Sequence, residues 1–540
     1  MPTLDWIGKQ AVVNHHQEVP YRLLHCDPAR SAGDPDSPNL LVQGDNLLAL
    51  KALLPYYAGK VKCIYIDPPY NTGNEGWIYN DNVNAPEIKS WLGKTVGKEA
   101  EDLSRHDKWL CMMYPRLQLL REFLSEDGAI FVSIDDNEVQ NLRGMMDAIF
   151  GGNNFVATVI WQKMDSPKNT AIHLSEDHDY IVLYAKHAQT WRPHPVPRNE
   201  KMVARYKNPD NDARGVWLLS DLAARNFYAA GRYPIRTPSG KVIEGPPSGS
   251  YWRVSRDRFD ELERDGRIWW GKSGSNRPGI KRFLSEVREG VVPQTLWPWS
   301  EVGSTRHAKQ ELSQVMAGGA SSDLFVTPKP TRLIERVMQI ASESTSLILD
   351  SFSGSGTTGH AVLEINKRHS GNRRFILIEM EENIATDVTG QRLRRVIDGY
   401  QNSKGEQVEA LGGGFRYCTL GEPLFDADGT IRPQVKYKDL AHHIFFTETG
   451  MPLPLRKSNT RGPLLGTHQD KAIYLLFNGI LGDRSVAGGN VLTRKTLESC
   501  GGLSIQSPRV IYGEGNRLGA ATLRRLGVTF KQLPYDVKVS

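Results

Sequence analysis

Short apolar runs alternate with stretches of helical periodicity in the first third of the chain. The apolar runs predict strands at 40–42, 61–66, 129–134, 157–161 and 180–184, and the periodic stretches predict helices over 46–54 and 109–124. The runs are mostly apolar and do not alternate with polar positions, which is typical of parallel strands buried on both faces. The pattern therefore predicts an α/β fold.

The pattern changes between residues 188 and 324 and then returns. Within this segment Arg, Gly, Pro and aromatic residues dominate, and turn signals such as Pro246-Pro247-Ser248-Gly249 are frequent. Apolar strands reappear at 346–350 and 374–379, separated by a glycine-rich turn and a helix over 359–366, as in a βαβ unit. We therefore expect one α/β domain that is interrupted by a loop-rich module.

These changes divide the chain into five segments. They are an N-terminal extension at 1–35, the first half of the α/β domain at 36–187, the inserted module at 188–324, the second half of the α/β domain at 325–400, and a C-terminal accessory domain at 401–540. We expect the last segment to mediate dimerisation and the protein to be a homodimer.

Composition narrows the class of protein only slightly. With 39% hydrophobic and 24% charged residues, the chain is typical of globular proteins. No apolar run approaches the roughly 18 residues of a membrane-spanning helix, and residues 1–5 do not begin a signal peptide. We therefore expect a cytoplasmic protein that binds no membrane. The net charge of +6 allows a polyanionic partner without requiring one.

The cysteines predict neither a disulfide framework nor a metal site. There are five of them, scattered without a CxxC pair: Cys26, Cys63, Cys111, Cys418 and Cys500. The adjacent histidines His15-His16 and His442-His443 have no obvious partner ligands. We expect reduced structural thiols and no bound metal.

The first chemical motif, Asp67-Pro68-Pro69-Tyr70, directly follows an apolar strand. Open α/β sheets bind ligands at this end of their strands, and the two prolines make the turn rigid. The Asp67 carboxylate and the Pro68 carbonyl can accept both hydrogens of an exocyclic amine, which localises electron density on its nitrogen. Tyr70 offers a flat face to an extruded base. The alternative is a tight turn with a capping Asp.

The second motif also follows a strand and opens into a helix. It reads Asp350-Ser351-Phe352-Ser353-Gly354-Ser355-Gly356-Thr357-Thr358. Its glycines let the backbone approach a ligand, and Glu379 ends the next strand, where nucleotide sites place a carboxylate against ribose hydroxyls. The loop lacks the Lys of a phosphate-binding P-loop, which disfavours ATP. The alternative is a glycine-rich turn without a ligand.

Together the two motifs resemble those of amino-methyltransferases that act on DNA, in the order of the β class. The closer resemblance is to the Mod subunit of type III restriction-modification systems. It rests also on Gly44-Asp45-Asn46-Leu47, Ser133-Ile134-Asp135-Asp136-Asn137-Glu138, His178-Asp179-Tyr180-Ile181 and Phe325-Val326-Thr327-Pro328-Lys329-Pro330. The resemblance covers about residues 35–400 and is weak after residue 400.

This resemblance implies a Rossmann-like, S-adenosylmethionine-dependent methyltransferase core. Segment 36–187 is then the catalytic half, 325–400 the cofactor-binding half, and 188–324 a target-recognition domain. Catalytic roles fall to Asp67, Pro68, Pro69 and Tyr70. Cofactor contacts fall to Asp45 near the adenine, Phe325 and Lys329 near the methionine end, Asp350 at the methionine amino group, Glu379 at the ribose, and Phe352, Gly354, Ser355, Gly356, Thr357 and Thr358 along the loop. Alternatively, Asp45 only caps the helix that starts at Asn46.

The implied reaction is methyl transfer to N6 of an adenine flipped out of double-stranded DNA, and the implied partner is a helicase-nuclease restriction subunit. Between 200 and 310, basic residues interleaved with Trp and Tyr suit a DNA-binding surface, although about half of the rings or more are expected to be core. Two alternatives remain. Cytosine-N4 enzymes of this type usually carry Ser in place of Asp67, and a non-catalytic DNA-specificity subunit would bind no cofactor.

Overall fold

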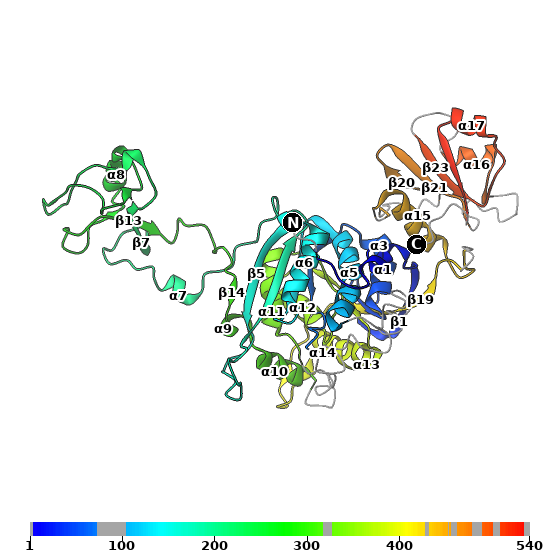
Figure 1. Ribbon diagram of the computed structural model, residues 1–540, viewed down its shortest axis with the longest axis horizontal. Helices are drawn as coiled ribbons and strands as arrows, with labels where there is room; N and C mark the ends of the chain where they lie inside the picture. Colours follow the sequence, from blue (N-terminus) through cyan, green and yellow to red (C-terminus); the bar gives the residue numbers. More distant parts are fainter. Residues whose placement is uncertain are drawn as a thin grey trace. The chain divides into compact units, whose positions relative to one another are not determined.

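The computed structural model describes residues 4–72, 104–316, 327–426, 431–451, 453–454, 462–477, 489–500 and 508–533. The chain forms two compact units, one built from Met1–His194 with Gln294–Ser540 and the other from Pro195–Pro293 (Figure 1). The second unit is shorter at both ends than segment 188–324. At its C-terminal side the reason is that β14 (Leu296–Trp297) pairs with β5 (Phe155–Gln162) of the first unit.

The first unit is organised around a ten-stranded sheet of order β1-β19-β2-β16-β15-β3-β4-β6-β5-β14. Its five central strands are parallel: β2 (Leu40–Gln43), β16 (Arg374–Glu379), β15 (Leu347–Asp350), β3 (Val61–Ile66) and β4 (Leu124–Ile134). β19 (Gly414–Pro423) is parallel to β2, whereas β1 (Arg22–Gly33) and β6 (His178–Ala185) are antiparallel to their neighbours. The predicted α/β fold is confirmed, and so are the parallel strands at 40–42, 61–66, 129–134, 346–350 and 374–379. The predicted strand at 180–184 is instead antiparallel to both of its neighbours.

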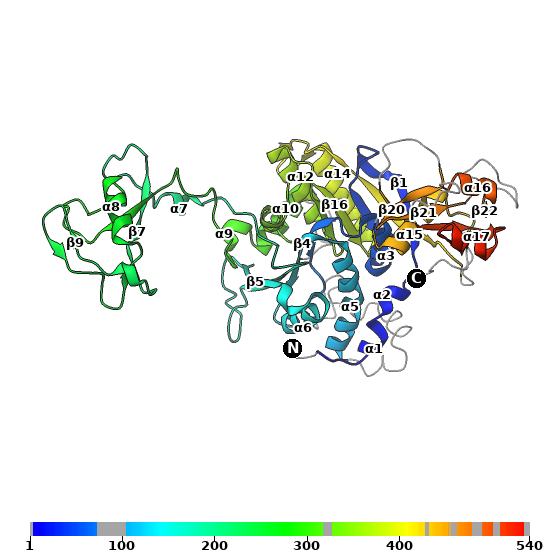
Figure 2. The same ribbon diagram turned by 90° about the horizontal axis from the view of Figure 1, so that it is seen from above.

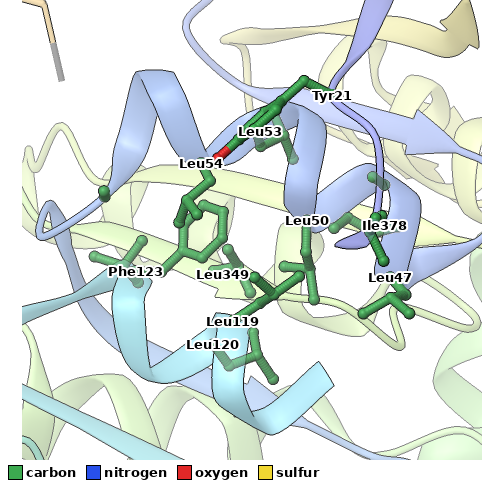
Figure 3. Close-up of a cluster of buried hydrophobic side chains, with 14 of the residues drawn as sticks. Tyr21, Leu47, Leu50, Leu53, Leu54, Leu119, Leu120, Phe123, Leu349 and Ile378 are labelled. Carbon is green, nitrogen blue, oxygen red and sulfur yellow. The ribbon is translucent and has the colours of Figure 1, made fainter. Parts of the chain in front are cut away.

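Two layers of helices cover this sheet. One contains α3 (Asn46–Tyr57), α5 (Arg105–Phe123) and α6 (Val139–Phe150), and the other contains α11 (Thr331–Ala341), α12 (Thr357–His369) and α14 (Gln391–Asp398). Figure 2 shows α5 and α6 on the opposite side of the sheet from α12 and α14. Figure 3 shows leucines of α3 and α5 packed with Leu349 of β15 and Ile378 of β16. This buried cluster fixes the strands whose ends carry both motifs.

Further short helices complete the first unit. They are α1 (Lys9–Val12) and α2 (His15–Glu18) near the N-terminus, α9 (Trp299–Val302) and α10 (Thr305–Val315) after the inserted unit, and α13 (Glu382–Ile384) after β16. Among the described helices none is both long and apolar enough to cross a membrane.

The C-terminal region contributes to the main sheet before it forms a sheet of its own. After the hairpin of β17 (Tyr400–Gln401) and β18 (Gln407–Val408), β19 joins the core. α15 (Tyr437–Thr449) then packs on α3, with the His442 ring 4.3 Å from that of Tyr56. The second sheet has the order β20 (Leu464–His468), β21 (Lys471–Leu475), β23 (Arg509–Gly513), β25 (Val528–Gln532). Around it lie β22 (Val491–Leu492), α16 (Arg494–Glu498), β24 (Gly515–Asn516) and α17 (Ala520–Arg525).

The prediction that all cysteines are reduced is wrong for one pair. Cys26 of β1 and Cys418 of β19 face each other in the antiparallel register and form a disulfide. Because 392 residues separate the two cysteines in the chain, no local sequence pattern indicates that they lie close together. Cys63, Cys111 and Cys500 are free and buried, as expected.

The second unit has a small core of its own. β12 (Ile268–Trp269), β13 (Gly279–Phe283) and β7 (Trp217–Asp221) form a sheet, and β8 (Ala223–Ala224) pairs with β11 (Tyr251–Trp252). β9 (Ile235–Arg236) pairs with β10 (Val242–Ile243), and the helices are α7 (Glu200–Val203) and α8 (Arg256–Arg264). Trp217, Trp252 and Trp270 are buried, so these rings serve the core.

Candidate active site

Three carboxylates meet at the carboxyl edge of the central parallel strands. Asp67 directly follows β3, Asp350 ends the neighbouring β15, and Glu379 ends β16, the next strand along. β15 and β16 lie between β2 and β3 although they come almost 300 residues later in the chain. This interleaving brings the two sequence motifs together at the edge where open α/β sheets bind ligands.

Asp67 is held by a buried lysine. Its Oδ2 accepts a hydrogen bond of 2.5 Å from Nζ of Lys329, and both side chains are largely buried. Burial raises the pKa of Asp67, and the Lys329 ammonium opposes that rise. Among the described residues, Oδ1 of Asp67 has no hydrogen-bond partner. A buried acceptor of this kind is stabilised by an incoming N–H donor.

Lys329 lies between the two motifs. Its carbonyl accepts a hydrogen bond of 3.0 Å from Oγ1 of Thr357 in the glycine loop, while its ammonium contacts Asp67. The same ammonium lies 5.1 Å from the ring centroid of Tyr70. The residue that the sequence assigns to the methionine end of a cofactor therefore also holds the carboxylate of the other motif.

Tyr70 is oriented by two residues to which the sequence reasoning assigned no role, one of them within the motif His178-Asp179-Tyr180-Ile181. Its hydroxyl lies 3.5 Å from Oδ2 of Asp179 in β6, and Oδ1 of Asp179 accepts a 2.6 Å bond from Nζ of Lys163. Burial, together with the carboxylates of Asp67 and Asp179, raises the pKa of Tyr70 well above its ordinary value, so the ring stays neutral. The motif His178-Asp179-Tyr180-Ile181 was the sequence signal for Asp179, whereas Lys163, just after a strand, belongs to no motif.

The two prolines hold the turn against α5. Nε1 of Trp109 donates a hydrogen bond of 2.6 Å to the carbonyl of Pro69, and Trp109 is completely buried. Pro68 is buried as well. The turn after β3 therefore has a fixed geometry, as the two prolines predict.

The glycine loop is fixed by the carboxylates on either side of it. Asp350 accepts from the backbone N–H of Phe352 at 3.0 Å and from the Thr358 hydroxyl at 2.6 Å. Glu379 accepts from the backbone N–H of Gly354 at 2.9 Å. Gly354 and Gly356 have φ of 48° and 75°, which favours glycine at both positions. Burial raises the pKa of Asp350 to about 7.

A buried arginine supports the loop from behind. The guanidinium of Arg392 in α14 donates to the carbonyl of Ser355 at 3.3 Å and to Oγ1 of Thr357 at 2.9 Å. Arg392 is fully buried, and it lies between the loop and His360 of α12. Sequence reasoning missed this residue because its partners are 32 to 37 residues away.

Asp45 caps α3, as the alternative interpretation states. Its side chain accepts from the backbone N–H of Leu48 at 3.0 Å and from Nη2 of Arg116 at 2.9 Å. Arg116 also donates to the side chain of Asn46, which donates in turn to the carbonyl of Ser351 at 3.2 Å. Asn46 and Arg116, which were assigned no role from the sequence, line a cavity together with Asp67, Phe352 and Glu379. Phe325, which was predicted, lies outside the described residues.

Two cavities adjoin at Asp67 and Phe352. The smaller is lined by Tyr65, Asp67, Lys329, Ile334, Asp350, Phe352, Ser353, Gly354, Ser355, Thr357 and Thr358. The larger is lined by Asn46, Asp67, Pro69, Met112, Arg116, Ser351, Phe352, Ile378, Glu379 and Met380. Together they bring Asp67 next to the glycine loop. Within the described ranges, no group of three or more His, Cys, Asp or Glu side chains could hold a metal ion.

The fold and this site define an α/β protein with a ligand cavity at the carboxyl edge of its parallel strands. Residues 61–389 match the model of the DNA methylase family, and the chain belongs to that family.

Among its relatives are Mod subunits of type III restriction-modification enzymes. The StyLTI Mod subunit of Salmonella typhimurium is 33% identical over 72% of this chain and 60% of its own length. The EcoPI Mod subunit of Escherichia phage P1 is 33% identical over 70% and 64%, and the EcoP15I Mod subunit of Escherichia coli is 29% identical over 80% and 75%. The chain thus spans less than two thirds of the first two relatives. The predicted resemblance to Mod subunits is confirmed.

Proposed function

We propose that the protein is a DNA methyltransferase that uses S-adenosylmethionine to methylate N6 of an adenine flipped out of the duplex. The observation that carries this proposal is the unpartnered Oδ1 of Asp67, buried beside Tyr70 where the two cavities meet. An exocyclic amine satisfies this oxygen, and Tyr70 supplies a flat face for the base.

The residues of the two cavities fit S-adenosylmethionine. The hydroxyls of Ser351 and Ser353 are buried without a hydrogen-bond partner among the described residues, so both can hydrogen-bond to a ligand. Asp350 would hold the α-amino group and Glu379 the ribose hydroxyls. Phe352, which lines both cavities, would contact the cofactor where they meet. The arrangement favours Asn46 and Arg116 over Asp45 beside the adenine, because these two line the cavity.

The chain's own residues prepare the target amine. When bound, the cofactor supplies an electrophilic methyl group. Oδ1 of Asp67 accepts one N–H of the amine and localises the lone pair on the nitrogen, and Tyr70 holds the base in plane. The Lys329 ammonium favours the ionised form of Asp67 and so opposes the rise in pKa that burial causes. As the new N–C bond forms, the bond between the methyl carbon and the cofactor's sulfur breaks and the sulfur keeps its electron pair. The nitrogen would lose one proton to Oδ1 of Asp67, which already accepts its N–H.

Lys329→Met should move the acidic limb of the kcat profile to higher pH. Removing the ammonium takes away the largest influence that opposes burial, so the pKa of Asp67 rises further and Asp67 becomes protonated at a higher pH. The measurement is kcat against pH at saturating cofactor and DNA. Lys329→Arg, which keeps the charge, should restore much of the wild-type profile. An unchanged limb in Lys329→Met would show that this ion pair does not set the protonation of Asp67.

Cofactor affinity should fall below pH 7. The cationic α-amino group binds ionised Asp350, whose pKa is about 7 without ligand, so binding at lower pH must release a proton. Kd should rise about tenfold per pH unit well below 7 and be flat just above it. Calorimetry on the wild type and on Asp350→Asn tests this. The variant should bind more weakly and without this pH dependence, and equal slopes for both proteins would remove Asp350 from the site.

Nucleoside mass spectrometry tests the reaction itself. The protein is incubated with unmethylated duplex DNA and isotopically labelled S-adenosylmethionine, and the digested DNA is analysed. We expect labelled N6-methyladenine. Labelled N4-methylcytosine would establish the cytosine alternative instead. DNA binding without any labelled nucleoside, and without cofactor binding, would indicate a specificity subunit.

We also propose the assembly that the resemblance to Mod subunits implies. Unit Pro195–Pro293 would recognise the target sequence, and a helicase-nuclease restriction subunit would be the partner. Homodimerisation through 401–540 and a cytoplasmic location stay predictions.

A further inference from the structure

Positive charge is unevenly distributed in unit Pro195–Pro293, all of whose residues the structure describes. Residues 222–253 carry one carboxylate, Glu244, and five exposed cations: Arg225, Arg232, Arg236, Lys241 and Arg253. Within this unit none of the five forms an ion pair, whereas Arg214, Arg256, Arg258, Arg267 and Lys281 all do. The segment 222–253 therefore presents uncompensated positive charge.

An exposed aromatic ring lies in the same segment. Phe227 follows β8 and has 79% of its surface exposed. Its ring centroid is 5.3 Å from that of Tyr251, in an edge-to-face arrangement, and the guanidinium of Arg232 lies 4.8 Å from the Tyr251 centroid. Phe227, Tyr251 and Arg232 thus form one aromatic and basic cluster, with Arg225 two residues from Phe227 in the chain.

The loop that carries Phe227 is anchored at both ends. Ala224 pairs with Tyr251 in the β8–β11 ladder, and the loop ends at η3 (Ala229–Gly231). A Cβ atom at Gly231 would lie only 2.3 Å from the carbonyl oxygen of Trp252, so this close approach requires glycine. Since the backbone is fixed in this way, the exposure of Phe227 is a property of the folded unit.

We propose that loop 225–232 and Tyr251 form the DNA-contacting surface of this unit, with Phe227 stacking on or wedging between bases and Arg225 and Arg232 binding phosphates. An exposed ring flanked by guanidinium groups that form no ion pair within the unit matches a partner that offers both base faces and dense negative charge. The charge of 222–253 makes duplex DNA a better fit than an apolar protein surface. This inference rests on the proposed function and assigns its DNA contacts to named residues.

The test compares Phe227→Ala with Val292→Ala, a variant of another strongly exposed apolar residue of the unit. Affinity for a methylatable duplex is measured by fluorescence anisotropy in the full-length protein. Loss of one base contact should raise Kd about 5- to 150-fold for Phe227→Ala and leave it unchanged for Val292→Ala. Both variants should keep the wild-type Tm and cofactor Kd, because neither side chain is buried.

The arginines are tested by the salt dependence of DNA binding. Arg225→Ala and Arg232→Ala should each reduce the slope of log Kd against log salt by about one, as expected for one lost phosphate contact. Arg258→Ala is the control, since Arg258 is exposed but pairs with Glu261. An unchanged Kd in Phe227→Ala and unchanged slopes in both arginine variants would overturn the proposal, as would loss of binding to a restriction subunit with DNA affinity intact. A wild-type protein that binds DNA but methylates no base would contradict the proposed function instead.

Discussion

Asp67→Ala should lower kcat by about 10²- to 10⁴-fold while leaving the Kd for S-adenosylmethionine nearly unchanged. Oδ1 of Asp67 is the acceptor proposed for the target amine, and among the described residues nothing else in the protein hydrogen-bonds to it. The cofactor contacts, by contrast, come chiefly from the loop after β15 and from the end of β16. Single-turnover methylation with calorimetry on the same preparation separates the two effects.

The variant also leaves Lys329 buried without its carboxylate, which can lower stability. Thermal unfolding is therefore measured alongside, and Asp67→Asn serves as a second variant that keeps the volume and one acceptor oxygen. Asp36→Ala, at an exposed aspartate, is the matched control and should behave as wild type. Folded Asp67→Ala protein with wild-type kcat would refute the catalytic role of this residue.

Gly354→Val should weaken cofactor binding about 10- to 100-fold, because a branched side chain enters the cavity that Gly354 lines. Gly354 has φ of 48° and lines the smaller cavity, and its N–H is bonded to Glu379. The added methyl groups would occupy space that the proposed site leaves to the ligand. Calorimetry with S-adenosylmethionine measures the loss.

The backbone strain of valine at positive φ must be separated from this steric effect. Gly405 has φ of 81° with nothing within 4 Å of a built Cβ, so Gly405→Val carries similar strain outside the cavities. We expect a reduced Tm in both variants and weakened cofactor binding only in Gly354→Val. Unchanged affinity in folded Gly354→Val would place the cofactor elsewhere.

Local patterns in the sequence were sufficient to predict the strands that carry the motifs. β3, β15 and β16 are mostly apolar runs, and each leads into an acidic residue at its carboxyl end: Asp67, Asp350 or Glu379. The insertion of β15 and β16 between β2 and β3 could not be derived in this way, because strand order depends on contacts between distant segments. Only the resemblance to a known family indicated that the two motifs belong to one methyltransferase core.

Residues that support the site through distant contacts were missed for the same reason. Asp179 and Lys163 orient Tyr70, and Arg392 holds the glycine loop. Asp179 lies in a motif that carried the family resemblance, but no local pattern gave any of the three residues a role. The Cys26–Cys418 disulfide is another such pair. In the inserted unit, composition indicated aromatic residues at a DNA surface and about half of the rings or more in the core, and Trp217, Trp252 and Trp270 do pack inside.

Single-molecule sequencing of DNA treated with the protein and S-adenosylmethionine tests the central claim most directly, because it reads the modified base, its sequence context and its strand together. We predict N6-methyladenine at one recurring sequence, and none with Asp67→Ala. Modified cytosines at the recurring sequence, or unmodified DNA from folded protein that binds the cofactor, would contradict the account.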